Sequence, residues 1–568
     1  MDREKYSDIL VDFYTPIFTA AEEFQAPPEF DAVIEGPAFN AIECASAICK
    51  IKVAKSPAED HLVPEMLRPL IESSICMERI KSFFNSVRVS HPVPDRWRTI
   101  ECKQLPKSKV NQSHMLTNKS RSIAMVPCDM KTYDVLMQSR YQPFFDGLAQ
   151  NQFGFRSGFQ ATEASFVLRQ IVEKARFWGA HAYIYKCDIS KAFDKVSHGG
   201  LVAGLRSLGV PDYCTYNVLK MNRCQSFFHV DGINSAPIQR TCSIMQGMSS
   251  SSPIYCSVMD LLFVVLKRRW GQMGWALDTL VISHILYADD VTIIAATRTE
   301  FELMVQEFRS CLQAFNMTLE HAKSQWCTTS AGLADTADLV IDGLALPMQP
   351  HAEGFQFVGH KIAFTGRQQN ELKHRTDCAV NKFHAVEKAW KNNRCSWREI
   401  LPYADKMATS ALQYGIGSIR PNRDDIHSLD ALQRRLGNKA CRLRIRNTET
   451  WHMFNKRSKD ILGNRFAQLG IRSWTNLYLL RYFQWCGHVA RLAPERLAHK
   501  LLKCRSQWYL EQIRSNGAGL GRQVYASPWH YEEPIYAWAS IVQGNANWQF
   551  LAQDRLSWCN LANSFIDC

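Results

Sequence analysis

Two apolar runs rich in β-branched residues flank a short polar turn near the middle of the chain. The first run covers residues 280–286, the second covers residues 291–296, and Tyr287-Ala288-Asp289-Asp290 joins them. Runs of this kind joined by a polar tip predict a β-hairpin, whose turn would hold two adjacent carboxylates at the edge of a buried sheet. Because Asp is a favoured turn residue, a solvated and purely structural turn is the alternative.

Helical and strand-like patterns alternate on either side of residue 180. Apolar residues recur at helical spacing over Gln160–Trp178, and Gly179 supplies a stop. The next run, Tyr183–Asp188, predicts a strand that ends in an acid. Another helix should begin at Pro253, because proline suits the first turn of a helix. The pattern thus mixes helices and short strands up to about residue 365, after a proline-containing and loosely organised lead-in over residues 1–60.

Strand signals fade after Gly366, and the chain becomes basic. The stretches Lys373–Trp390 and Ile426–Arg442 have helical patterns. The formal net charge of the chain is +13, and residues 366–460 contain twenty Lys and Arg against ten Asp and Glu. This excess suggests a polyanionic partner. Basic residues that only solvate helical faces are the alternative.

Length and composition narrow the class of protein. A chain of 568 residues and 65.0 kDa is expected to form two or three domains. No apolar run reaches the roughly eighteen residues that cross a bilayer, and the amino terminus lacks the apolar core of a signal peptide. We therefore expect a soluble, intracellular protein without a membrane partner, nuclear if its source is eukaryotic, although no targeting signal is identified.

The cysteines point to reduced thiols. All nineteen are scattered along the chain without a Cys-x-x-Cys pair, which argues against a disulfide framework or a zinc ribbon. Cys486-Gly487-His488 does place a Cys beside a His. A lone pair of this kind arises from packing more often than from metal binding.

A third acid completes a constellation with the predicted hairpin. The strand that ends at Asp188 continues as Ile189-Ser190-Lys191-Ala192-Phe193-Asp194, about a hundred residues before Asp289 and Asp290. Three carboxylates on neighbouring strand ends supply the hard oxygen ligands that divalent cations need. In nucleotidyl transfer, two such ions lie roughly 3.5–4 Å apart. Asp188, Asp289 and Asp290 fit the role of their ligands.

These residues resemble motifs of a known family. The segment Lys186–Asp194 is similar to the first palm motif, and Tyr287–Asp290 to the third, of reverse transcriptases of non-LTR (LINE-type) retrotransposons. Further segments resemble other motifs of that family in the same order. They are Leu105-Pro106-Lys107 and Arg121-Ser122-Ile123 of the fingers, the Gln-x-Gly-Phe-Arg segment Gln152–Gly158, the stretch Asn316–Ser324 with Lys323, and the primer-grip hairpin Phe355–Gly359. A weaker likeness covers the Gly-His-Val-x-Arg stretch in Leu480–Arg491, for which packing is the simplest role.

Around the nucleotide, the resemblance implies a steric gate and a second palm motif. Phe193 lies where reverse transcriptases hold an aromatic ring against the sugar of the incoming nucleotide; a core Phe is the alternative. Gln246 and Gly247 match the start of the second palm motif, in which Gly lets the backbone approach the base pair. The family usually reads Gln-Gly-x-x-x-Ser-Pro, but Ser252 stands here where Pro is expected and Pro253 falls one residue late. A flexible serine turn is the alternative.

The resemblance implies a right-hand polymerase of the α+β class. Its parts would be a lead-in (1–60), fingers and an antiparallel palm with helices (61–365), a basic helical thumb (366–460) and a mostly helical C-terminal region (461–568). The implied activity is RNA-directed DNA synthesis. A primer 3′-hydroxyl would attack a dNTP opposite an RNA template, and the thumb would grip the RNA–DNA hybrid by shape and charge.

The same resemblance assigns roles to single residues. It implies two Mg²⁺ ions, replaceable by Mn²⁺, held by Asp188, Ile189, Asp289 and Asp290. The triphosphate would be clamped by Lys107 and Arg121, with Phe193, Gln246 and Gly247 lining the nucleotide pocket. Lys323 is the candidate general acid for the leaving pyrophosphate.

Other functions remain open. A catalytically inactive, maturase-like RNA-binding remnant would keep the fold, and the altered second palm motif leaves room for it. An RNA-dependent RNA polymerase would be expected to place a ribose-accepting polar residue near position 193, so Phe193 argues against that class. Elements of this family usually carry an endonuclease, for which the sequence shows no motif; a piece of a larger element and a degenerate copy are both compatible with this.

Overall fold

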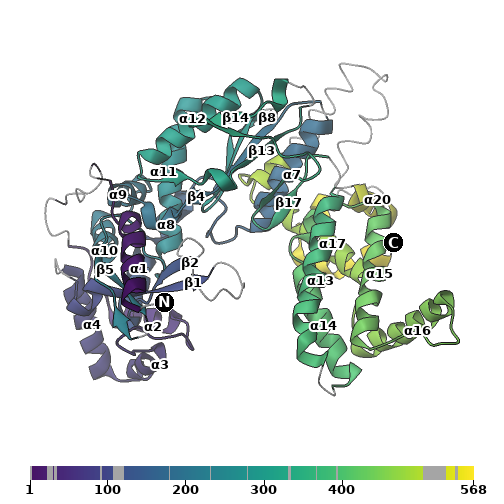
Figure 1. Ribbon diagram of the computed structural model, residues 1–568, viewed down its shortest axis with the longest axis horizontal. Helices are drawn as coiled ribbons and strands as arrows, with labels where there is room; N and C mark the ends of the chain where they lie inside the picture. The colour runs from purple at the N-terminus through teal and green to yellow at the C-terminus, as the bar shows by residue number, and fades with distance from the viewer. Residues whose placement is uncertain are drawn as a thin grey trace.

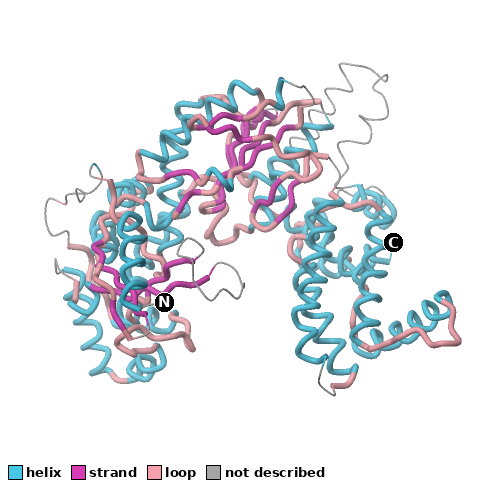
Figure 2. The backbone as a smooth tube through the Cα atoms, viewed as in Figure 1, coloured by secondary structure: helices cyan, strands magenta, loops and turns pink. Residues whose placement is uncertain are grey.

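The computed structural model describes most of the chain as a mixed α+β protein. The described residues are 3–21, 23, 30, 35–89, 93–106, 120–177, 179–230, 232–277, 279–330, 334–365, 368–391, 395–502, 533–543 and 548–567. Among these residues, strands occur only before residue 365, and the C-terminal part is helical (Figures 1 and 2). The predicted α+β class and the helical character of the C-terminal part are confirmed.

A four-stranded antiparallel sheet lies at the centre of the chain, in the order β10-β11-β3-β13. Its strands are β3 (Tyr183–Cys187), β10 (His284–Tyr287), β11 (Asp290–Ala295) and β13 (Gln325–Thr328). The predicted strand and hairpin are therefore confirmed. Because Val291 of β11 pairs with Cys187 of β3, the end of β3 lies beside the β10–β11 turn.

The two faces of this sheet belong to different hydrophobic cores. Tyr185 and Ile293 point into the first core, with helices α11 (Ser251–Trp270) and α12 (Arg298–Gln313). Their neighbours Ile184 and Ile294 point into the second core, with α7 (Ala161–Phe177), which agrees with the helix predicted over Gln160–Trp178. This alternation with a period of two explains why the strands are apolar on both faces.

A second, five-stranded sheet forms the core of the N-terminal lobe, in the order β2-β1-β5-β6 with β7 also paired to β5. Its strands are β1 (Thr99–Pro106), β2 (Ser120–Ala124), β5 (Gln225–Val230), β6 (Ile233–Asn234) and β7 (Ile238–Gln239). The helices of this part are α4 (Ser74–Val89), α6 (Cys128–Tyr141), α9 (His198–Ser207) and α10 (Asp212–Asn222). Strand β1 lies between β2 and β5 in this sheet, and it pairs antiparallel to β2 and parallel to β5.

The first sixty residues are more ordered than a loose lead-in. Helix α1 (Arg3–Phe18) buries Leu10, Tyr14 and Phe18 in the first core, and α2 (Ala41–Lys50) is closed by a capping box. The guanidinium of Arg240 lies 3.8 Å from the centre of the Phe18 ring. The expectation of a loosely organised lead-in was wrong for α1 and α2, because their apolar faces meet partners that lie far along the chain.

Helices alone make up the described chain beyond residue 368. They are α13 (Gln369–Lys391), α14 (Trp397–Leu412), α15 (Arg423–Ala440), α16 (Trp451–Leu469), α17 (Trp474–Ala490), α20 (Glu533–Gln543), α21 (Trp548–Leu551), α22 (Arg555–Asn560) and α23 (Ala562–Asp567). Helices α13 and α15 match the two that the sequence predicts, and α16 projects from the lobe in Figure 1.

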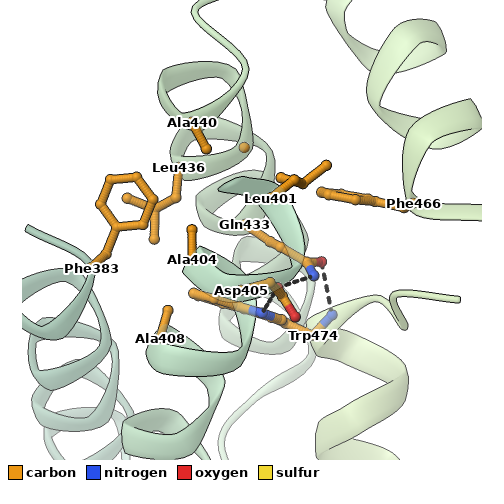
Figure 3. Close-up of a pocket in the computed structure, with 11 residues that line it drawn as sticks. Phe383, Leu401, Ala404, Asp405, Ala408, Gln433, Leu436, Ala440, Phe466 and Trp474 are labelled. Carbon is orange, nitrogen blue, oxygen red and sulfur yellow. Dashed lines mark hydrogen bonds between the residues drawn. The ribbon is translucent and has the colours of Figure 1, made fainter. Parts of the chain in front are cut away.

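A partly buried carboxylate joins three of these helices (Figure 3). Asp405 on α14 accepts hydrogen bonds from Gln433 Nε2 of α15 at 3.0 Å and from Trp474 Nε1 of α17 at 3.2 Å. The Gln433 side chain in turn accepts from the Trp474 backbone N–H at 3.1 Å. Residues on both sides of position 460 thus share one core. The domain boundary expected from the sequence between residues 460 and 461 would cut through this core.

Shorter elements connect these units. They are α3 (Pro64–Leu67), α5 (Asp95–Arg98), α8 (Ala192–Lys195), β4 (Ile189–Ser190), β8 (Trp275–Leu277), β9 (Leu280–Ile282), β12 (Thr318–Leu319), β14 (Leu339–Ile341), β15 (Leu344–Leu346), β16 (Phe355–Phe357), β17 (His360–Ile362) and the 3₁₀ turns η2 (Arg68–Glu72), η4 (Gln142–Gly147), η5 (His321–Lys323), η6 (Ala334–Thr336) and η7 (Ile416–Ser418). The cysteines among the described residues are free thiols. No helix in the described part is both long and apolar enough to span a membrane.

Candidate active site

The three acids predicted as a site come together at one end of the four-stranded sheet. Asp188 directly follows β3, Asp290 begins β11, and Asp289 lies in the turn between β10 and β11. The pKa of Asp289 is raised, first by burial, then by the charge of Asp290 and also by Asp188. The carboxylates are therefore close enough to repel one another.

Two lysines neutralise this cluster. Lys323 Nζ lies 2.6 Å from Asp188 Oδ2, and this hydrogen bond is the main cause of the raised Lys323 pKa. Lys186 Nζ lies 3.1 Å from Asp290 Oδ1. Lys323 was predicted, whereas Lys186 was not singled out. The sequence could have indicated Lys186, because it precedes Asp188 by two residues and alternate residues of a strand point to the same face.

The turn that carries Asp289 is held by the Gln-x-Gly-Phe-Arg segment. Ala288 has a φ of 56°, a left-handed conformation that is costly for a residue with a Cβ. Gln152 Oε1 accepts hydrogen bonds from Gly154 N at 2.9 Å and from Ala288 N at 3.3 Å. A Cβ on Gly154 would lie 2.5 Å from Ala288 N, so only glycine permits this approach. The segment thus acts as a clamp behind the acids, a role that the sequence did not suggest.

Phe193 and Gln246 are each held by a neighbouring side chain. The Phe193 ring on α8 is half-buried and stacks on Tyr255 of α11, with ring centres 4.6 Å apart. Gln246 Nε2 donates to Asp194 Oδ2 at 3.1 Å. Gly247 has a φ of 136°, and a Cβ there would lie 2.4 Å from the carbonyl oxygen of Ala124 on β2. The second palm-like segment is therefore packed directly against β2.

Of the two residues predicted to clamp the triphosphate, the structure describes Arg121 but not Lys107. Arg121 is exposed on β2, and its charge lowers the pKa of Asp289 as the smallest of the causes, so it interacts electrostatically with that acid. Lys107 lies outside the described residues. Ile189 is on β4 with a buried apolar side chain, so only its backbone carbonyl could bind an ion.

The serine run after Gly247 is held by hydrogen bonds, which argues against the alternative of a flexible turn. Asp134 Oδ2 on α6 accepts hydrogen bonds from the backbone N–H groups of Ser249 at 2.8 Å and Ser250 at 3.1 Å. The Ser250 hydroxyl donates to the other oxygen. Helix α11 consequently begins at Ser251, two residues before Pro253. Burial raises the pKa of Asp134 to about 6. No local pattern could have identified Asp134 as this cap.

The donor set fits a divalent cation in chemical type. Asp188, Asp289 and Asp290 offer carboxylate oxygens, the ligands that Mg²⁺ prefers. Among the described residues, however, no three His, Cys, Asp or Glu side chains are arranged so that they could hold an ion. In the observed arrangement Lys323 and Lys186 are the counter-ions of Asp188 and Asp290.

A small hairpin lies beyond the acids, as the sequence predicts. Strands β16 and β17 pair antiparallel around a turn in which Val358 and Gly359 have φ of 43° and 78°. The buried carboxylate of Glu371 on α13 accepts from His360 Nδ1 at 2.9 Å and is paired with Arg375 Nε at 3.0 Å. These contacts fix the hairpin to the base of α13.

Comparison with known proteins identifies the central segment. Residues 105–362 match the family described as "Reverse transcriptase (RNA-dependent DNA polymerase)". The chain is 23% identical over 233 residues to the "Retrovirus-related Pol polyprotein from type-2 retrotransposable element R2DM" of Drosophila melanogaster, covering 39% of this chain and 20% of that protein. It is 25% identical over 317 residues to the "RNA-directed DNA polymerase from mobile element jockey" of the same organism, covering 54% and 31%.

The match to a third relative is of similar extent. The "Retrovirus-related Pol polyprotein from type-1 retrotransposable element R2" of Nasonia vitripennis is 23% identical over 238 residues, which cover 42% of this chain and 22% of that protein. The chain therefore matches between a fifth and a third of the length of these relatives. Among solved structures, telomerase from Candida albicans in complex with a fragment of telomeric RNA has a TM-score of 0.34 at 9% identity, covering 69% of this chain and 64% of that one.

Proposed function

Because the chain is a reverse transcriptase with distant homology to the R2 and jockey retrotransposon proteins, we propose that it is an active RNA-directed DNA polymerase of a non-LTR element. The 3′-hydroxyl of a primer attacks the α-phosphate of a dNTP, one phosphodiester bond forms, and pyrophosphate leaves. The observation that carries this proposal is the position of Asp188 beside the Asp289–Asp290 turn.

In this proposal the acids hold Mg²⁺, or Mn²⁺ in its place, together with the carbonyl of Ile189. Such ions, when bound, activate the attacking hydroxyl and stabilise the leaving oxygen. Binding requires Lys323 and Lys186 to move off Asp188 and Asp290. A released Lys323 carries a proton that it can donate to the pyrophosphate.

In this proposal, side chains around the acids bind and select the nucleotide. Arg121, with Lys107, holds the β- and γ-phosphates as a cationic clamp. Phe193 is braced from behind by Tyr255, so its ring cannot easily move away from a ribose 2′-hydroxyl. This favours dNTPs over ribonucleotides.

We also propose the right-hand division of the fold. The five-stranded sheet and its helices are the fingers, the four-stranded sheet with α7, α11 and α12 is the palm, and α13 to α15 form the thumb. The thumb binds an RNA–DNA hybrid mainly through phosphates, so its affinity falls with salt. The ordered start of α11 supports an active enzyme, because the serine shift that favoured an inactive remnant does not disrupt this helix.

Primer extension on an RNA template with Mg²⁺ tests the proposal. Asp289→Asn should abolish extension and leave hybrid binding largely intact, whereas Asp338→Asn, a change at an exposed aspartate, should have no effect on either. Full extension by Asp289→Asn would contradict the two-metal assignment. A wild-type protein that binds the hybrid but never extends the primer would favour the RNA-binding remnant.

A further inference from the structure

A polar groove of about 450 Å³ has Tyr414 in its lining, a residue that is bonded to the β16–β17 hairpin, and the three acids are not among the lining residues. Its walls are the start of α7, the end of α14, the η7 turn and one face of α17. The part of α17 that lines it belongs to the Gly-His-Val-x-Arg stretch, for which the sequence offered no chemistry. Nothing in the proposed reaction uses this groove.

The groove is rich in hydrogen-bond donors and free of negative charge. Its lining contains an arginine, a histidine, glutamines and hydroxyls, but no Asp or Glu. Arg481 is exposed, and its guanidinium donates to Gln484 Oε1 at 3.0 Å and to Gln413 Oε1 at 2.5 Å. The two glutamines thus orient the cation at the rim. The amino-terminal end of α7, near Thr162, adds the partial positive charge of a helix dipole.

Two ring nitrogens in the lining have no hydrogen-bond partner among the described residues. They are Nε1 of Trp485, whose side chain is only 7% exposed, and Nε2 of His488. Leaving a buried donor unpaired costs on the order of 1–3 kcal/mol. The rings also contact each other, with centres 5.2 Å apart. The indole N–H of Trp485 is a donor in every protonation state, so this wall retains one unused donor for a ligand that enters the groove.

The groove is connected to the active site through Tyr414. This residue lines the groove, stacks on His360, and donates its hydroxyl proton to the Val358 carbonyl in the hairpin turn at 2.9 Å. The pKa of Tyr414 is raised by burial and next by Tyr287, which begins the turn that carries the acids. Tyr414 thus links the groove to the hairpin turn.

We propose that this groove binds the phosphodiester backbone of one strand of the nucleic-acid duplex behind the active site. Arg481 pairs with a phosphate, and the Trp485 indole N–H donates to the same backbone. The nature of the strand rests on the proposed polymerase function. The recognition chemistry rests on the groove alone, since a donor-rich site without carboxylates selects an anion.

Binding of a fluorescent RNA–DNA hybrid over a range of salt concentrations tests the groove. Arg481→Gln should weaken binding about tenfold and make the slope of log affinity against log salt shallower by about one. Trp485→Phe keeps the ring against Phe166 but removes the N–H. It should weaken binding without changing the slope. Arg268→Gln, at an exposed residue of α11 outside the groove, is the matched control. Wild-type affinity and slope in both groove variants would overturn the proposal.

Neutral methylphosphonates placed at successive positions identify the strand. We expect one position, in either the DNA strand or the RNA strand, to weaken wild-type binding but to have no further effect on Arg481→Gln. Additive effects at every position of both strands would overturn the proposal. Primer extension is measured in parallel. Absent extension with Arg481-dependent binding would contradict the polymerase function while supporting the groove.

Discussion

Substitution of Asp134 tests how the start of helix α11 is stabilised. Its carboxylate is fully buried on α6 and receives two backbone N–H groups and one hydroxyl from Ser249 and Ser250. Asp134→Asn preserves this geometry. The amide oxygen can accept both N–H groups, and the amide nitrogen can donate to the Ser250 hydroxyl. The substitution therefore removes a buried charge without removing a hydrogen bond.

The expected magnitude follows from the pKa of Asp134, which burial raises from 3.8 to about 6. The folded state then binds more protons than the unfolded state between about pH 4 and pH 6, so this group's contribution to stability is lost as pH rises through that window. A difference of about two pKa units corresponds to about 3 kcal/mol, an order-of-magnitude figure. Asp134→Asn should escape this loss because an amide does not titrate.

Urea unfolding of both proteins at several pH values measures the effect. The free energy of unfolding of Asp134→Asn, minus that of the wild type, should rise between pH 4 and pH 6 to about 3 kcal/mol in favour of the variant. Asp134→Ala, which removes the acceptor for both N–H groups, should be less stable than Asp134→Asn throughout. A difference that is flat with pH, or a variant that is less stable at pH 7, would refute the reasoning.

Three further substitutions test other contacts of the site. Gln152→Met removes the acceptor for Ala288 N–H and should slow single-turnover extension at least tenfold with hybrid affinity unchanged, because buried donors in the turn lose their partner (about 1–3 kcal/mol each); an unchanged rate would exclude the clamp. Phe193→Val should raise the incorporation of ribonucleotides relative to dNTPs. An unaltered ratio would exclude a steric-gate role for Phe193. Glu371→Gln should lower the free energy of unfolding by about 3 kcal/mol in urea titrations, because Arg375 loses its buried counter-charge; unchanged stability would count against that role.

Local patterns were sufficient to predict strand β3, the β10–β11 hairpin and the helices α7, α11, α13 and α15. Alternating and continuous apolar runs identify β3 and the β10–β11 hairpin, and the short polar turn between β10 and β11 leaves little freedom for Asp289 and Asp290. The prediction that Asp188 joins them depended on the two motifs together. The register of β3 with β11 explains why that inference holds.

The residues that sequence patterns missed act across long separations. Asp134 caps a helix that starts more than a hundred residues later, and Gln152 holds Ala288 across a similar distance. Neither side chain carries a local signal, because a buried Asp and a buried Gln look like ordinary polar residues until their partners are known. The packing of α1 on the first core was missed for the same reason.

The order of strands in the central sheet also sets the order in which the chain can fold. Strand β3 lies between β11 and β13, and both partners are more than a hundred residues further along. During synthesis β3 therefore emerges with two unpaired edges and waits until about residue 328 has left the ribosome. Such non-local pairing makes folding slow and exposes the nascent chain to aggregation. The segment that brings the acids together is thus among the last parts of the sheet to gain its neighbours.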